Sequence, residues 1–264
     1  MDVVQIVLLA IATFIFAIDQ FSLTELLYRP IVACPILGLI LGDVNTGLVV
    51  GGTYELMMIG NMPVGGAQPP NAVLGSVVAM VLATVGKLSP EEALGLAVIF
   101  AVLGQYVVTL TFTAMSVFMA KADKAAEEAN PKGIAQVNYI SMAILGVLFA
   151  ACAVVIYVGG VTLQEPIMAF KTNFAWFMTG LGAAGGMMRY VGFAILLKIM
   201  LANDMWGIYF AGFAAAALLG NVSATAGATL LLVAFIGAAI AVYDFTINVK
   251  LASNAGNGGS SDGI

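Results

Sequence analysis

The chain has 264 residues, of which 62% are hydrophobic and only 9% are charged, with a formal net charge of −5. Water-soluble domains carry about 25% charged residues, so this composition excludes a soluble globular protein. The negative charge argues against nucleic acid as a partner, and the absence of histidine from the sequence excludes most catalytic triads and zinc sites. We therefore expect an all-α polytopic membrane protein with about seven to nine crossings or half-crossings.

Apolar runs follow one another along the whole chain. Each run predicts a helix that crosses or partly crosses the bilayer, because about 20 apolar residues span its hydrocarbon core. The runs cover 3–18, 28–41, 48–59, 72–85, 93–119, 134–158, 180–200, 205–219 and 228–242. The stretch 164–177 is more amphipathic and predicts a helix at the membrane interface. We expect 1–250 to form the membrane-embedded domain and the Gly/Ser/Asn-rich stretch 251–264 to be a disordered tail.

Two polar segments separate the middle runs. Ser89 followed by Pro90 predicts a helix start, because serine is a good N-cap and proline fits the first helical position. The charged segment 120–133 predicts a hydrophilic loop made by a helical extension that ends before Pro131. Its three lysines favour the cytoplasmic side of the membrane.

The segment 60–71 cannot form a continuous helix, because it contains three prolines and three glycines. Both of its flanks are nevertheless as hydrophobic as membrane-spanning helices. Non-helical backbone at membrane depth is tolerated only where protein buries it or where it lines a wet cavity. We therefore expect a re-entrant hairpin or the break of a discontinuous helix here.

Glu55 lies inside an apolar run, shortly before that segment. A charged side chain in hydrocarbon costs a few kcal/mol and therefore marks either function or a paired structural role. In the functional interpretation, the carboxylate accepts hydrogen bonds from the hydroxyl groups of a small polar solute. In the structural interpretation, it pairs with a helix terminus or with Arg189. The neighbouring broken segment favours function.

Amide side chains gather around the same segment. Gln68 and Asn71 flank Pro69-Pro70, and they either bind a solute or satisfy backbone groups that the prolines leave free. Both interpretations stay open, and Asn61 is a weaker case of the same kind. Gln105 lies in the middle of a later run and either makes an interhelical hydrogen bond or belongs to the site.

Other polar and small residues have structural interpretations. Arg29 begins a run, where its side chain could extend to the membrane surface. Asp43 predicts a capped turn between two helices. Gly47 and the pair Gly51-Gly52 permit close helix packing. The sequence contains no phosphate-binding loop, dinucleotide fingerprint or metal motif, so we expect no cofactor and no metal.

These motifs together resemble a known family. The stretch from Arg29 to Asp43 with Thr46-Gly47, followed by Gly51-Gly52-Thr53-Tyr54-Glu55 and Gly65-Gly66-Ala67-Gln68-Pro69-Pro70-Asn71, resembles the IIC component of the mannose-family sugar phosphotransferase system. The segments 119–124 and 184–187 are similar to that family as well. The resemblance covers nearly the whole chain except the tail.

The resemblance implies that IIC and IID membrane subunits form the sugar path in the bacterial cytoplasmic membrane. Soluble IIA and IIB components would relay phosphate from phosphoenolpyruvate, and this chain would be a non-catalytic subunit. The family is similar to elevator transporters, with a moving core, a scaffold and a trimer of IIC–IID pairs. The predicted sugar-binding residues are Glu55, Asn61, Gly65, Gly66, Ala67, Gln68, Asn71 and Gln105.

The substrate is predicted from one motif. The form Gly-Gly-Ala-Gln-Pro-Pro-Asn at 65–71 is similar to the branch that handles N-acetylgalactosamine or galactosamine. Mannose, glucose and sorbose stay open as substrates. Two other kinds of protein stay open as well: a membrane scaffold or receptor that transports nothing, and an ion channel lined by Glu55.

Overall fold

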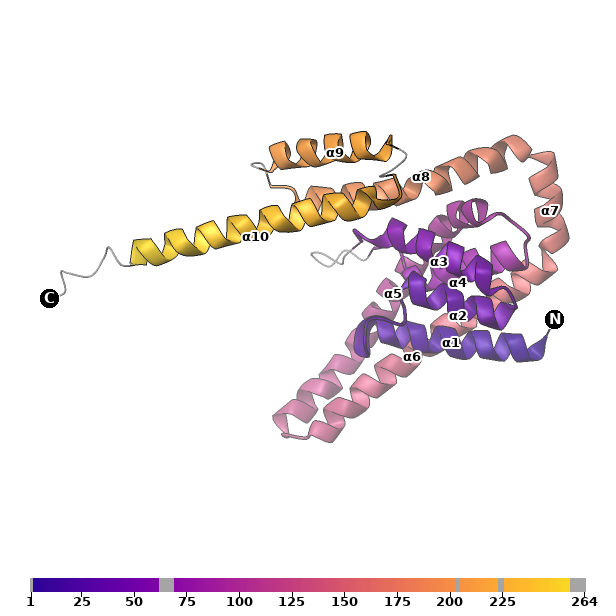
Figure 1. Ribbon diagram of the computed structural model, residues 1–264. Helices are drawn as coiled ribbons and strands as arrows, with labels where there is room; N and C mark the ends of the chain where they lie inside the picture. The colour runs from indigo at the N-terminus through magenta and orange to yellow at the C-terminus, as the bar shows by residue number, and fades with distance from the viewer. Residues whose placement is uncertain (1, 62–68, 203–204, 223–225, 257–264) are drawn as a thin grey trace. The chain divides into compact units, whose positions relative to one another are not determined.

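The computed structural model describes residues 2–61, 69–202, 205–222 and 226–256, and every regular element in them is helical (Figure 1). The helices are α1 (Val3–Ser22), α2 (Pro30–Leu41), α3 (Val44–Met58), α4 (Ala72–Thr84), α5 (Pro90–Glu127), α6 (Pro131–Thr162), α7 (Gln164–Asn173), α8 (Ala175–Met200), α9 (Trp206–Gly220), the short 3₁₀ helix η1 (Ala226–Ala228) and α10 (Thr229–Gly256). Each predicted apolar run is a helix, which confirms the all-α membrane fold. The chain divides into two compact units, Met1–Ile199 and Met200–Ile264.

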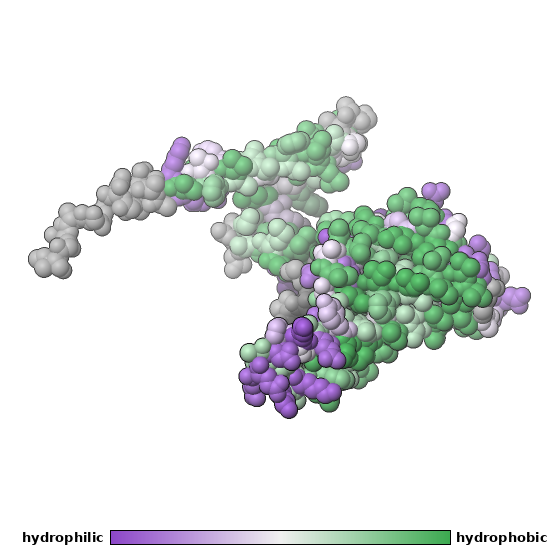
Figure 2. All heavy atoms as spheres, turned by 90° about the horizontal axis from the view of Figure 1, so that it is seen from below, coloured by the Kyte–Doolittle hydropathy of each residue, from purple (hydrophilic) through white to green (hydrophobic). Residues whose placement is uncertain are grey.

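The helices fall into two length classes. Among the described residues, α1, α5, α6, α8 and the Thr229–Lys250 part of α10 are long and apolar enough to cross a membrane. In contrast, α2, α3 and α4 have 12, 15 and 13 residues. At about 1.5 Å per residue they reach only about 18–22 Å, short of the roughly 30 Å hydrocarbon core. Figure 2 shows that much of the visible surface is hydrophobic, as a bilayer requires.

The short helix α4 forms the centre of the first unit. All of its residues except Leu82 are buried, and it packs against α2, α3, α5 and α6. A helix that is apolar on every side is expected inside a protein rather than at its surface. Because α4 is held on all sides, its N-terminus provides a fixed wall for the site described below.

The α2–α3 hairpin turns at Gly42 and Asp43. Gly42 ends α2 in the left-handed conformation with φ +86°, which glycine adopts without a Cβ clash. The Asp43 carboxylate accepts hydrogen bonds from the Thr46 N–H at 3.0 Å and the Thr46 hydroxyl at 2.6 Å. The predicted capped turn is therefore confirmed.

Glycines allow α2 and α3 to approach closely. A Cβ added to Gly47 would lie 2.7 Å from the Cys34 carbonyl oxygen, and one added to Gly51 would lie 2.7 Å from the Pro30 carbonyl oxygen. Both distances are shorter than real Cβ contacts, and both neighbours are backbone atoms that cannot rotate away. The prediction of close packing is confirmed at Gly47 and Gly51 but is wrong for Gly52, where an added Cβ would meet no atom within 4 Å.

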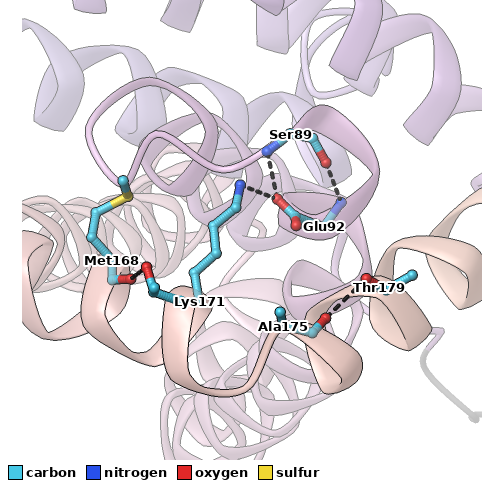
Figure 3. Close-up of polar contacts among 7 residues, drawn as sticks. Ser89, Glu92, Met168, Lys171, Ala175 and Thr179 are labelled. Atoms are coloured by element: carbon cyan, nitrogen blue, oxygen red, sulfur yellow. Dashed lines mark hydrogen bonds and ion pairs between the residues drawn. The ribbon is translucent and has the colours of Figure 1, made fainter.

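The start of α5 is fixed by a capping box that also holds α7 (Figure 3). The Ser89 hydroxyl accepts a hydrogen bond from the Glu92 N–H, and the Glu92 carboxylate accepts one from the Ser89 N–H at 2.8 Å. Lys171 of α7 donates to the same carboxylate at 2.7 Å. The predicted helix start at Ser89-Pro90 is confirmed, and the amphipathic stretch contains α7, which one ion pair ties to α5.

The remaining boundaries refine the predictions. Helix α5 ends at Glu127 and α6 begins at Pro131, so most of 120–133 is helical, as expected.

Residues 59–61 and 69–71 are not helical, which agrees with a break between α3 and α4, while 62–68 lie outside the described residues. Helix α10 extends to Gly256, past the expected start of a disordered tail, because residues 251–255 contain neither proline nor glycine.

Candidate functional site

A polar cavity of about 430 Å³ lies where the end of α1, the 23–29 loop, the start of α2, the end of α3 and the start of α4 converge. This volume is within the range of sites that bind small molecules. Its polar lining consists of Gln20, Glu25, Tyr28, Arg29, Glu55 and Asn61. Apolar atoms of Phe21, Met58 and Ile59 complete the wall, so the cavity offers both hydrogen-bonding groups and a nonpolar surface.

An ion pair between Arg29 and Glu55 lies at the centre of this lining. The Arg29 Nε donates to Glu55 Oε1 at 2.8 Å, and its Nη2 contacts the same oxygen. The Ile31 N–H in the first turn of α2 donates to Glu55 Oε2 at 3.3 Å, where the helix dipole also favours a negative charge. The Glu55 side chain is 12% exposed and that of Arg29 is 46% exposed, so the pair faces the cavity mainly through the guanidinium.

The structural interpretation of Glu55 predicted that it pairs with a helix terminus or with Arg189. The first part is correct, because Glu55 accepts a hydrogen bond at the N-terminus of α2. Its partner is Arg29, however, and not Arg189, whose Nε donates to the Gly186 carbonyl oxygen at 3.0 Å on its own helix. The α2–α3 hairpin brings Arg29 beside Glu55. For the same reason, Arg29 does more than extend to the membrane surface.

Asn71 has the structural role that the sequence left open. Its side chain is buried, its Oδ1 accepts the Leu74 N–H at 2.9 Å as the N-cap of α4, and its own N–H donates to the Ala101 carbonyl oxygen. Its Nδ2 donates to Gln20 Oε1 at 2.9 Å. Asn71 therefore does not line the cavity but orients Gln20, which does.

The other predicted residues have different locations. Asn61 lines the cavity, and its Nδ2 donates to the Met58 sulfur at 3.1 Å. Gln105 is half-buried on α5 and is not part of the cavity lining. Gly65, Gly66, Ala67 and Gln68 lie outside the described residues. Of the predicted set, the structure thus brings Glu55 and Asn61 into one cavity.

Sequence reasoning missed the contribution of the first interhelical segment. Gln20, Glu25 and Tyr28 lie in or beside the polar interruption after the first apolar run, and each lines the cavity. The same criterion that selected 60–71, polar residues between membrane-grade flanks, could have selected them. Predicting that this segment and 60–71 line one cavity would have required knowing that the C-terminal ends of α1 and α3 lie close together.

The lining of the cavity contains groups that can form hydrogen bonds with a hydroxylated molecule. Amides and the tyrosine hydroxyl both donate and accept hydrogen bonds, and sugar hydroxyls do the same. No group of three or more metal-ligating side chains occurs within residues 2–61, 69–202, 205–222 and 226–256. The lining is thus suited to recognising a polar solute by hydrogen bonds.

Known proteins with similar sequences and structures identify the family. The family model described as "PTS system sorbose-specific IIC component" matches residues 3–243. The N-acetylgalactosamine permease IIC component 1 of Escherichia coli is 36% identical over 238 residues, which cover 90% of this chain and 86% of the relative.

Two solved structures agree with this result. A membrane protein structure matches with a TM-score of 0.82 at 29% identity, covering 93% of this chain and 96% of that one. The mannose transporter ManYZ, solved in complex with a microcin, matches with a TM-score of 0.59 at 29% identity and the same coverage. The chain therefore belongs to the mannose-type IIC components of the phosphotransferase system, which are multi-pass permease subunits of the bacterial inner membrane.

Proposed function

We propose that this chain binds a sugar in the cavity around Arg29 and Glu55 and carries it across the membrane. The observation that supports this most is the convergence of six polar side chains, from the end of α1, the 23–29 loop, α3 and the segment after α3, on one cavity beside the short helices α2, α3 and α4. Polar groups in a membrane protein are costly unless they are paired or serve a solute. Within a membrane protein, such groups are tolerated where protein shields them from lipid or where they line a wet cavity.

The proposed sugar is an amino sugar, either N-acetylgalactosamine or galactosamine. The name of the Escherichia coli relative supports this class. The charges of the cavity favour galactosamine in particular, because its ammonium is positive and the lining has two carboxylates, Glu25 and Glu55, but one guanidinium, Arg29. Sorbose and mannose are the competing substrates, since the family description and the ManYZ structure carry those names.

The proposed setting is a permease that depends on phosphoenolpyruvate. A IID membrane subunit would complete the sugar path, and soluble IIA and IIB components would supply the phosphate, so that the sugar is phosphorylated on arrival. We further propose an elevator-type movement of a core against a scaffold, in a trimer of IIC–IID pairs. The pairing of two membrane subunits in the name ManYZ supports the IID partner.

Reconstitution tests the proposal directly. The chain would be co-purified with its IID subunit, placed in vesicles and supplied with IIA, IIB and phosphoenolpyruvate. We expect saturable uptake and phosphorylation of N-acetylgalactosamine or galactosamine, with sorbose and mannose competing weakly. Saturable sugar binding that is never followed by uptake would indicate a receptor or scaffold, and ion flux without sugar uptake would indicate a channel.

Glu25→Gln tests the charge argument for the amino sugar. Glu25 is exposed, so its attraction for a ligand ammonium is screened and should change affinity by about two- to fivefold. We expect galactosamine, which carries the ammonium, to bind more weakly to the variant, and N-acetylgalactosamine to bind as before. Competition assays on the purified complex measure both affinities, and equal losses for the two sugars would contradict a charge-specific role.

A further inference from the structure

Asp19, near the end of α1, is a buried carboxylate that none of the roles above uses. Its Oδ1 accepts hydrogen bonds from the Thr24 N–H at 2.9 Å and the Thr24 hydroxyl at 2.7 Å. Its Oδ2 accepts the Leu27 N–H at 2.6 Å and the Tyr28 N–H at 3.1 Å. Both oxygens are therefore fully engaged, and all four donors belong to the segment between α1 and α2.

A buried carboxylate loses its hydration, and that loss is tolerated only where other groups replace the water. Here three backbone N–H groups and one hydroxyl replace it. Hydrogen bonds to a charged acceptor are shorter and stronger than neutral ones. Asp19 thus holds the backbone of residues 24–28 more firmly than an ordinary loop contact would.

The segment that Asp19 holds supplies part of the cavity wall. Glu25, Tyr28 and Arg29 line the cavity. Glu25 lies within the bonded segment with φ 55°, a left-handed conformation that non-glycine residues rarely adopt. Surrounding contacts must maintain such a conformation, and the hydrogen bonds on either side of Glu25 to Asp19 do so.

The neighbouring residue completes the arrangement. Gln20 lines the cavity and is itself held by Asn71, whereas Asp19 is fully buried and does not belong to the lining. Two consecutive residues near the end of α1 therefore have different roles. Gln20 lines the cavity, and Asp19 holds the loop between α1 and α2 by hydrogen bonds.

We infer that Asp19 is a positioning residue for sugar binding, which acts through residues 24–28 to place Glu25, Tyr28 and Arg29 in the cavity. This inference rests on the proposed function, because it assumes that the cavity binds the sugar. Asp19 itself does not touch the sugar, since its acceptor positions are already occupied. Its loss should therefore weaken sugar binding and leave the translocation rate at saturating sugar almost unchanged.

Two variants and one control test this inference in the reconstituted complex. Asp19→Asn places an amide NH₂ group where one pair of donors needs an acceptor, and we expect KM to rise about tenfold with kcat retained. Thr24→Val removes only the hydroxyl bond and should raise KM about two- to fivefold. Thr13→Val is the control, because Thr13 is equally buried on α1 but donates only to the Leu9 carbonyl oxygen at 2.8 Å, away from the cavity. It should leave KM unchanged.

The outcomes separate the inference from the proposed function. If the wild-type complex binds sugar and both Asp19→Asn and Thr24→Val keep the wild-type KM, the inference is wrong. It is also wrong if Thr13→Val raises KM as much as Asp19→Asn does, because the effect would then be general destabilisation of α1. If Asp19→Asn fails to assemble, the KM of Thr24→Val decides alone. A wild-type complex that binds no sugar would overturn the proposed function, and this inference with it.

Discussion

Replacing Glu55 with glutamine is expected to weaken sugar binding about 10- to 150-fold, the range that corresponds to losing a hydrogen-bonded charge worth about 1.5–3 kcal/mol. Glutamine keeps the shape of the side chain but removes its charge. Arg29, which lines the cavity, would then lose its carboxylate partner, and the charge of its guanidinium would be left unpaired. Uptake measured over a range of sugar concentrations in reconstituted vesicles reports the change.

The control for this variant is Glu128→Gln, at an exposed glutamate beyond the end of α5 that is not part of the cavity lining. It removes the same charge and should leave uptake unchanged. Normal transport and affinity in Glu55→Gln would show that Glu55 is only a structural partner of Arg29 and not part of a sugar site.

Adding a single methyl group at Gly51 is the second change with a large expected effect. In Gly51→Ala the new Cβ would lie 2.7 Å from the Pro30 carbonyl oxygen, so α2 and α3 must move apart. Overpacking of this kind costs about 1–3 kcal/mol. Because Arg29 precedes Pro30 and Glu55 lies one turn after Gly51, the shift should also separate the ion pair. We expect a lower unfolding temperature of the purified complex together with weaker sugar binding.

The adjacent glycine supplies a matched control. A Cβ added to Gly52 meets no atom within 4 Å, so Gly52→Ala should fit without strain. Alanine also favours a helix over glycine by about 1 kcal/mol, so this variant should be as stable as the wild type or slightly more stable. Equal stability and affinity in Gly51→Ala and Gly52→Ala would show that close α2–α3 packing does not support the site.

The helices could be predicted from the sequence because their signals are local. Apolar runs, the serine-proline start of α5 and the capped turn at Asp43 each depend on residues near one another in the chain. Helix α4 is uniformly apolar, and such a composition already predicts burial. The length of α2, α3 and α4 was also visible in the sequence, because each apolar run there is too short for a full crossing.

The composition of the site was only partly predictable, because pairing between distant residues has no local signal. Glu55 was found as a charge in an apolar run, yet the arginine named as an alternative partner was Arg189, whereas the structure pairs Glu55 with Arg29. Asn71 was found as an amide beside prolines, but the choice between binding a solute and capping α4 needed the direction of its Oδ1. Gln105 was selected because it lies in the middle of a helix, and only the packed structure shows that it is outside the cavity lining.

The role of the first interhelical segment depended on tertiary structure most of all. Asp19 directly follows the first apolar run, 3–18, and its sequence neighbours give no reason to expect four hydrogen bonds to one carboxylate. That arrangement exists only because the chain folds back between α1 and α2 within ten residues, a turn that propensity alone does not specify.

Protection of a cysteine by sugar tests most directly whether the cavity around Arg29 and Glu55 is the sugar site. Both native cysteines, Cys34 and Cys152, would be replaced by alanine, and Met58→Cys would place a thiol in the cavity wall. Glu91→Cys, at an exposed position in the first turn of α5, serves as the reference. At a concentration of about ten times its Kd, the sugar should slow the labelling of Met58→Cys roughly tenfold. The labelling rate of Glu91→Cys should not change. Saturable sugar binding with unchanged labelling at Met58→Cys would contradict the account.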